Sequence, residues 1–238
     1  MKKTLKKILH KFGYKVSKIS NYQLQNPNVF FAIRDNINNQ APIVFDIGIN
    51  HGQTLDKIKK NIPKAIVHGF EASKYCFESL NKKYSIDPSI HLNNIAIGDK
   101  KTTLKFNEYS WDVMNSFLKR AYGQAKIVEQ YEVPVTTVDA YCFENDIKNI
   151  DLLKSDTEGF ELNALKGAKK LLENNKIKFV FVEMFFDLNF INQASVGEIF
   201  CFLEKYNFSL VQFQDFSITG RGLASKSDAL FINLDYNK

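Results

Sequence analysis

The stretch IVFDIGINHGQT, residues 43–54, decides the fold, because an apolar run passes directly into an aspartate and two glycines. The apolar start is typical of a strand covered on both faces, and the glycines mark a turn where the backbone approaches another group. Glycine has no β-carbon, so the loop can touch a ligand, and a helix that follows offers free N–H groups. The stretch therefore predicts a first strand, a ligand-binding loop and a first helix.

Strand-like and helix-like segments alternate after this point. Apolar runs predict strands at Ile43–Ile47, Ile66–Phe70, His91–Ile97, Ile150–Ser155 and Phe179–Met184. Helical spacing of apolar residues predicts helices at Thr54–Asn61, Ser73–Tyr84 and Glu161–Asn174. This order predicts an α/β fold with a mostly parallel sheet covered by helices, and such sheets bind ligands at the carboxyl ends of their strands.

Two regions depart from the alternation. Additional strands are predicted at Thr102–Tyr109 and Val133–Tyr141, with Ser110–Glu132 between them as an insertion over one edge of the sheet. A helix at Val196–Tyr206 precedes two further strands, Ser209–Phe216 and Ala229–Asp235. The loop between those strands is too short for a parallel crossover, so the last pair is predicted to be antiparallel.

Composition and charge narrow the class of protein. The chain has 238 residues, of which 45% are hydrophobic and 24% charged, as expected of an ordinary globular protein with one large domain. Three cysteines without a Cys-x-x-Cys pair support neither a disulfide framework nor a zinc finger. No signal peptide or membrane span is apparent, which predicts a cytoplasmic protein.

The net charge of +6 is concentrated at the start of the chain. Residues 1–18 carry seven lysines and no acidic residue, and Leu5, Ile8, Leu9 and Phe12 follow helical spacing. We therefore predict a basic amphipathic helix and a polar connector over residues 1–40, followed by one domain over 41–238. The helix either packs on that domain or lies on an anionic membrane surface, which would make the protein peripheral at the inner face of a membrane. Nucleic acid is disfavoured as a partner because the basic run lacks interleaved aromatic residues.

The glycine loop and the next two strand ends predict a nucleoside site. The candidate cofactor-binding residues are Asp46, Gly48, Asn50, Gly52, Thr54, Glu71, Asn94 and Ala96. The loop does not match Gly-x-Gly-x-x-Gly, which disfavours NAD, whereas Glu71 ends the second strand where a carboxylate accepts hydrogen bonds from ribose hydroxyls. Asp46 would repel a pyrophosphate but suits a charged amino-acid tail. These features together point to S-adenosylmethionine.

Several segments resemble one known family. They are VFDIGINHGQT, HGFEAS, NNIAIGDKKTTLKF, VPVTTVD and IDLLKSDTEGFELNALKGAKKLL followed by FVFVEM. They are similar to the FkbM family of S-adenosylmethionine-dependent methyltransferases over about Ile43 to Glu183, and the block Asp156 to Glu161 is the most specific part. The resemblance implies a class I methyltransferase (Rossmann-like) fold with seven strands, the last antiparallel, and O-methylation of a hydroxyl, often on a sugar. Alanine at position 72 and histidine at position 51 depart from the family pattern.

Acidic residues near the fourth and fifth strand ends form a second candidate group. Asp156, Glu158 and Glu183 are the candidate catalytic residues, and either Asp156 or Glu183, which end the fourth and fifth strands, could remove a hydroxyl proton. Glu158 and Glu161 could instead cap a helix, and the carboxylates could instead hold a divalent cation. We predict no metal, because no further ligand is evident and the four histidines lack metal-ligand spacing.

The sequence thus predicts an S-adenosylmethionine-dependent O-methyltransferase acting on a hydroxyl of a glycan, a glycolipid precursor or a related small molecule. Two alternatives stay open: a metal-assisted O-methyltransferase, and a binding module of glycan assembly that kept the fold without turnover.

Overall fold

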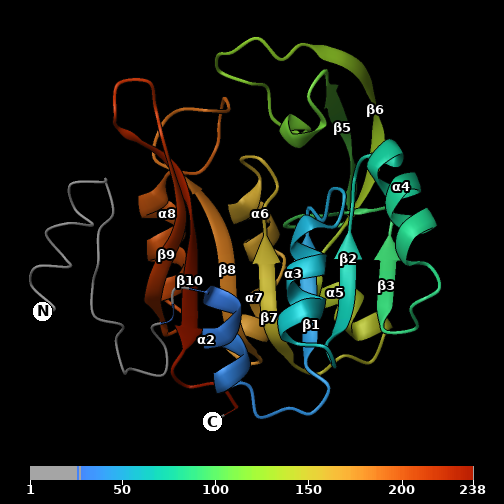
Figure 1. Cartoon of the computed structure of the whole chain (residues 1–238), viewed down its shortest axis with the longest axis vertical. Helices are drawn as coiled ribbons and strands as arrows, with labels where there is room; N and C mark the ends of the chain where they lie inside the picture. Colours follow the sequence, from blue (N-terminus) through green and yellow to red (C-terminus); the bar gives the residue numbers. More distant parts are fainter. Residues whose placement is uncertain (1–25, 27, 238) are drawn as a thin grey trace, which may run out of the picture.

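A seven-stranded sheet forms the centre of the protein in the computed structural model, which describes residue 26 and residues 28–237 (Figure 1). The strand order is β3-β2-β1-β7-β8-β10-β9. The strands are β1 (Ile43–Ile47), β2 (Ile66–Phe70), β3 (Ile90–Asn93), β7 (Ile150–Ser155), β8 (Ile177–Phe185), β9 (Phe208–Ile218) and β10 (Ala224–Asn233). The first five in this order along the sheet pair in parallel, whereas β10 is antiparallel to both of its neighbours. The predicted sheet, with its last strand antiparallel, is confirmed.

Helices cover both faces of this sheet because alternate strand residues point to opposite sides. One face packs against α2 (Val29–Asn36), α3 (Gln53–Asn61) and α4 (Lys74–Tyr84). The other packs against α5 (Val138–Glu144), α6 (Glu161–Lys166), α7 (Lys169–Glu173) and α8 (Val196–Glu204). In β1, Val44 belongs to the first core and Phe45 to the second. This alternation explains why the central strands read as unbroken apolar runs.

A second, smaller sheet extends past the carboxyl ends of the parallel strands (Figure 1). It contains β4 (Ala96–Ile97), β5 (Thr102–Tyr109) and β6 (Ile127–Thr136) in the order β4-β6-β5. The short 3₁₀ helix η1 (Asp112–Met114) lies between β5 and β6 in the chain. The predicted insertion therefore forms a structured cover near the end of the sheet where ligands bind.

Three of the predicted strands are wrong in part, and one of them, predicted at Ala229–Asp235, is β10 at Ala224–Asn233. The strand predicted at His91–Ile97 is two strands, because the chain leaves the main sheet at Asn94 and Ala96–Ile97 pair with β6 instead. The strand predicted at Val133–Tyr141 ends at Thr136, because Thr137 accepts a hydrogen bond from the Ala140 amide and caps α5. β6 also begins at Ile127, inside the segment for which no strand was predicted.

The helix predicted at Glu161–Asn174 is divided into α6 and α7. Gly167, at the break, passes so close to another segment that a β-carbon there would lie 2.2 Å from the Gly98 carbonyl oxygen. The close contact between the two backbones accounts for the glycine.

The predicted polar connector contains a helix. Asn28 caps α2 by accepting a hydrogen bond from the Phe30 amide, and the α2 side chains Val29, Phe30, Ala32 and Ile33 are buried against the sheet. The connector prediction is therefore wrong for these residues. The predicted basic helix at 1–18 lies outside the described residues. Among the residues that are described, none of the helices is both long and apolar enough to span a bilayer.

Candidate active site

The glycine loop after β1 has a backbone that only glycine accommodates easily. Gly48 and Gly52 have φ angles of 76° and 85°. A β-carbon at Gly48 would lie 1.8 Å from the Asp156 carbonyl oxygen, and one at Gly52 would lie 2.6 Å from the Tyr84 hydroxyl. The loop therefore keeps two points of close approach, one against the Asp156 segment and one against α4.

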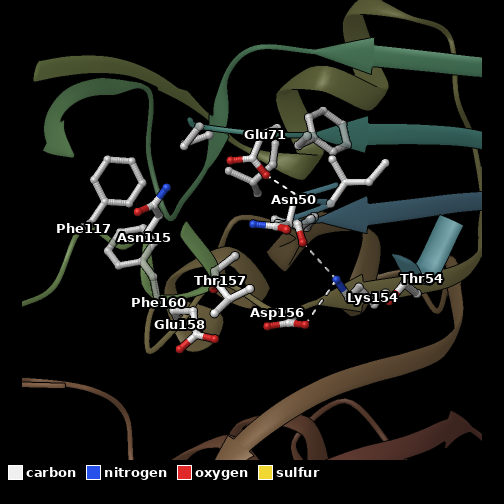
Figure 2. Close-up of a pocket in the computed structure, with 18 of the residues that line it drawn as sticks. Asn50, Thr54, Glu71, Asn115, Phe117, Lys154, Asp156, Thr157, Glu158 and Phe160 are labelled. Carbon is white, nitrogen blue, oxygen red and sulfur yellow. Dashed lines mark hydrogen bonds and ion pairs between the residues drawn. The ribbon is translucent and has the colours of Figure 1, made fainter. Parts of the chain in front are cut away.

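A pocket of about 310 Å³ opens beside this loop, between the carboxyl ends of β1, β2 and β7 and the second sheet (Figure 2). Seven of the predicted site residues line it: Gly48, Asn50, Thr54, Glu71, Ala96, Asp156 and Glu158. Four others do not: Asp46, Gly52, Asn94 and Glu183. The structure thus brings both predicted groups to one cavity, with the remaining four residues behind its wall.

Glu71 follows β2 directly and is held rigidly at the pocket. Its Oε2 accepts a hydrogen bond of 2.7 Å from the Asn50 amide, and its Oε1 accepts one of 2.8 Å from the Ser73 amide. Burial raises the pKa of Glu71 to about 7, against the opposing effect of these two bonds. Each carboxylate oxygen can accept a second hydrogen bond, so Glu71 can receive a pair of ligand hydroxyls.

Asn94 supports this residue from behind, since its side-chain amide donates a 2.8 Å hydrogen bond to the Glu71 carbonyl oxygen. The neighbouring Ile95, Ala96 and Ile97 line the pocket with Phe70. These side chains form an apolar wall next to Glu71, which suits an aromatic base.

Asp46 is fully buried and forms an ion pair that the sequence analysis missed. Lys154 Nζ lies 2.9 Å from Asp46 Oδ1 and 3.5 Å from Asp156 Oδ2, and it donates a 3.1 Å hydrogen bond to the Gly48 carbonyl oxygen. Burial lowers the pKa of Lys154, but the charges of Asp46 and Asp156 outweigh that effect and raise it. A lysine inside the apolar strand IDLLKS was the available signal. Lys154, which lines the pocket, therefore separates Asp46 from it.

The predicted catalytic residues lie together. One carboxylate oxygen each from Asp156, Glu158 and Glu183 lie within 4.8 Å of one another. Lys226 of β10, also missed in the sequence, lies 2.6 Å from Glu183 Oε1 and 3.7 Å from Glu158 Oε1. Burial raises the pKa of Glu158 to about 8 and raises that of Glu183 well above its ordinary value. The group thus holds protons or a cation more readily than exposed carboxylates do.

Glu161 has a different place. Its Oε1 accepts hydrogen bonds from the amides of Thr157 and Gly159, at 2.8 Å and 3.0 Å. Glu161 therefore closes the turn that carries Glu158, whose φ of 52° is left-handed. Glu161 is thus the first residue of α6, as predicted, but its carboxylate bonds to the preceding turn and does not cap the amides of the helix.

Aromatic residues complete the far side of the pocket. Phe117 from the insertion and Phe160 line it, with ring centroids 5.1 Å apart, and Asn115 lies beside them (Figure 2). The sequence analysis did not single out Asn115 and Phe117, because their positions depend on how the insertion folds, nor Phe160, which lies directly before α6. Trp111, in the same insertion, is 55% exposed.

The sheet order, the loop after β1 and the acidic residue after β2 define the class I methyltransferase fold. The residues of this chain fit S-adenosylmethionine, because Gly48 lines the pocket with its backbone and each Glu71 carboxylate oxygen keeps acceptor capacity there. Residues 46–210 match the model of the Methyltransferase FkbM domain. The chain belongs to this family, which confirms the resemblance.

Two proteins similar to this chain are informative. The 2-O-methyltransferase NoeI of Sinorhizobium fredii is 23% identical over 154 residues, which are 60% of this chain and 63% of NoeI. The crystal structure of methyltransferase FkbM from Methylobacillus flagellatus KT has a TM-score of 0.52 at 14% identity, covering 81% of this chain and 44% of that one. The chain therefore spans less than two thirds of the length of either protein, and the structural likeness shows the fold.

Proposed function

We propose that the protein transfers a methyl group from S-adenosylmethionine to a hydroxyl of a glycan, a glycolipid precursor or a related small molecule. The observation that carries this proposal is the single pocket that joins Glu71 and the glycine loop to the buried carboxylate of Glu158. The similarity to a 2-O-methyltransferase supports a hydroxyl acceptor.

The cofactor half of the pocket would use Glu71, Gly48 and the apolar wall. S-adenosylmethionine supplies a methyl group on a positively charged sulfur. Glu71 would accept hydrogen bonds from the two ribose hydroxyls, and Asn50 and Thr54 would lie along the same ligand. Lys154 keeps Asp46 neutralised and offers its ammonium at the pocket, where a carboxylate of the amino-acid tail could meet it.

The acceptor half would use the carboxylates near β7 and β8. Glu158 lines the pocket, and its Oε2 has no hydrogen-bond partner among the described residues. We assign Glu158, in its ionised form, as the group that takes the acceptor's hydroxyl proton, while the acceptor oxygen gains the methyl group. Lys226, which contacts both Glu158 and Glu183, would hold the Glu158 carboxylate in place. The negative charge of Asp156 would favour a positively charged group, such as the sulfonium of the cofactor, nearby.

The metal-assisted alternative is less favoured by the same contacts. Lys226 already places an ammonium 2.6 Å from Glu183, so a cation is present among the carboxylates without a metal ion. The membrane contact proposed for residues 1–18 rests on the sequence alone.

The experiment is to incubate the protein with S-adenosylmethionine and a glycan extract of its source organism, and to detect S-adenosylhomocysteine. We expect product with the wild type and at least ~100-fold slower turnover for Glu158→Gln, because general base catalysis contributes about 10²–10⁴-fold. Glu144→Gln, an exposed glutamate on α5, should be unchanged.

Two outcomes would favour the alternatives. Tight cofactor binding without turnover on any acceptor fraction would favour the binding module. Loss of turnover on chelation that Mg²⁺ restores would favour the metal-assisted reaction.

A further inference from the structure

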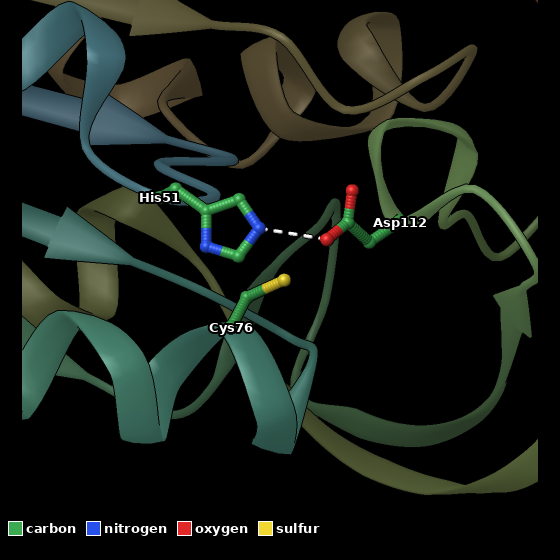
Figure 3. Close-up of side chains that lie close together, drawn as sticks. All are labelled: His51, Cys76 and Asp112. Carbon is green, nitrogen blue, oxygen red and sulfur yellow. Dashed lines mark hydrogen bonds and ion pairs between the residues drawn. The ribbon is translucent and has the colours of Figure 1, made fainter.

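Three side chains of types that bind metal ions, a histidine, a cysteine and an aspartate, lie close together at the rim of the pocket. They come from three separate elements: His51 from the glycine loop, Cys76 from the first turn of α4, and Asp112 from η1. One imidazole nitrogen, the Sγ atom and one carboxylate oxygen all lie within 4.8 Å of one another (Figure 3). His51 Nε2 and Asp112 Oδ2 are 2.7 Å apart, and the thiol of Cys76 points toward them (Figure 3).

The spacing suits a small, borderline-soft divalent cation. Zinc binds cysteine sulfur at about 2.3 Å and histidine nitrogen or carboxylate oxygen at about 2.0–2.2 Å, so its tetrahedral ligands lie about 3.3–3.8 Å apart. The three atoms here would reach that spacing with small side-chain movements. Both His51 and Asp112 can move, because their side chains are 41% and 50% exposed, and that exposure also leaves a path for the ion.

The charges also suit zinc. A thiolate and a carboxylate together balance a divalent cation, and a neutral imidazole adds a third ligand. The ordinary pKa of a cysteine thiol is about 8.5, so without a metal a thiol keeps its proton at neutral pH. Binding must therefore release that proton to solvent as the sulfur–metal bond forms, because a coordinating thiol is deprotonated.

The other close group of potential ligands differs in kind. Among the described residues, that group is Asp156, Glu158 and Glu183, which has only oxygen donors and includes the Lys226 ammonium among them. No lysine or arginine of the described residues is paired with the rim group, where the Asp112 carboxylate contacts His51 itself.

We propose that His51, Cys76 and Asp112 form a zinc site with water as the fourth ligand, which ties the glycine loop, α4 and η1 together at the pocket rim. Asp112 lines the pocket, and so does Asn50, the neighbour of the ligand His51 in the chain. The ion would therefore connect two parts of the pocket wall. The proposal does not depend on methyl transfer.

The test is calorimetric titration of the full chain with Zn²⁺, without cofactor or acceptor, in two buffers of different ionisation enthalpy. We expect one tight site and a buffer-dependent heat that reports proton release. Cys76→Ser and His51→Gln should each weaken binding by at least ~100-fold, because losing only an outer partner of a ligand costs about 10–100-fold. Cys142→Ser and His91→Gln are the matched controls, a second buried cysteine and a second exposed histidine, and should bind as the wild type does.

Cobalt(II) gives an independent readout. The Co²⁺ form should show a thiolate-to-cobalt absorption band that Cys76→Ser removes and Cys142→Ser retains. The proposal would be overturned if the wild type did not bind Zn²⁺ tightly. It would also be overturned if Cys76→Ser and His51→Gln bound Zn²⁺ as tightly as the wild type does. Both results are independent of turnover, so they leave the proposed methyl transfer to be judged separately.

Discussion

Lys154 Nζ lies 2.9 Å from Asp46 Oδ1, with both side chains buried in the middle of the sheet. Strand pairing places the two residues side by side, since Asp46 of β1 is in register with Lys154 of β7. The same ammonium donates to the Gly48 carbonyl oxygen at 3.1 Å. One lysine therefore neutralises a buried carboxylate and fixes the start of the glycine loop.

Lys154→Met should lower the free energy of unfolding by about 3–5 kcal/mol, because removing one partner leaves an uncompensated buried charge. Urea denaturation measures the loss. Lys101→Met, which breaks an exposed pair with Glu144, should change stability by about 1 kcal/mol or less. If the free energy of unfolding falls by about 1 kcal/mol or less in both variants, the buried ion pair contributes no more to stability than the exposed one. Adding Asp46→Asn to Lys154→Met should recover part of the loss.

Gly48→Ala should both destabilise the fold and abolish cofactor binding. The left-handed backbone at Gly48 costs an alanine about 1–2 kcal/mol, and its β-carbon would press on the Asp156 carbonyl oxygen besides. Thermal denaturation should show a loss of at least ~2 kcal/mol. Gly197→Ala in α8, where the nearest atom to a β-carbon is 4.0 Å away, should not destabilise. A Gly48→Ala variant as stable as the wild type would contradict the close approach of the two segments.

Stability should fall as the pH rises, because of Glu158. Its pKa is raised from 4.5 to about 8, chiefly by burial, so between these values the folded state binds a proton that the unfolded state has released. Stability rises with pH only where the unfolded state binds more protons, so here the free energy of unfolding decreases, by on the order of a few kcal/mol across the range.

Urea denaturation from pH 5 to pH 8 checks this decrease. Glu183, Glu71 and Glu161, whose pKa values burial also raises, act in the same direction. His68, whose pKa burial lowers to about 4, acts in the opposite direction, so the wild type alone does not isolate Glu158. Glu158→Gln should show a shallower decrease than the wild type. Parallel curves for the two proteins would mean that Glu158 titrates normally.

Deleting residues 1–18 tests the predicted membrane contact. The seven lysines of this segment would each contribute on the order of 1 kcal/mol on anionic lipid, less as salt is added. The full chain should therefore co-sediment with phosphatidylserine-containing liposomes at low salt, and the shortened chain should not. Cofactor affinity should be the same in both. A full chain that ignores such liposomes would rule out this contact.

The apolar runs in the sequence predicted the strands whose ends are set by neighbouring residues in the chain. The strands Ile43–Ile47, Ile66–Phe70, Thr102–Tyr109 and Ile150–Ser155 have the predicted bounds. In each case the residues around the run mark its limits. α2 was missed because its apolar residues stand within a polar stretch, and the division at Asn94 depends on pairing with a distant strand, β6.

The candidate site was predictable where a residue's place follows from a strand end. Glu71 and Asp156 lie at the pocket for this reason. Lys154 and Lys226 were missed because their importance comes from partners far along the chain, Asp46 and Glu183. The same pairing explains why Asp46 lies behind the pocket wall, which its position before the glycine loop did not reveal.

Calorimetric titration with S-adenosylmethionine tests the central claim most directly, since the proposed reaction depends on Glu71 holding the ribose. We expect the wild type to bind the cofactor and Glu71→Ala to bind at least ~100-fold more weakly, because two hydrogen bonds to a charged group, about 1.5–3 kcal/mol each, are lost. Circular dichroism should show that the variant keeps its fold, and Glu129→Ala, at a partly exposed glutamate on β6, should bind normally. A wild type that fails to bind, or a Glu71→Ala variant with unchanged affinity, would contradict the account.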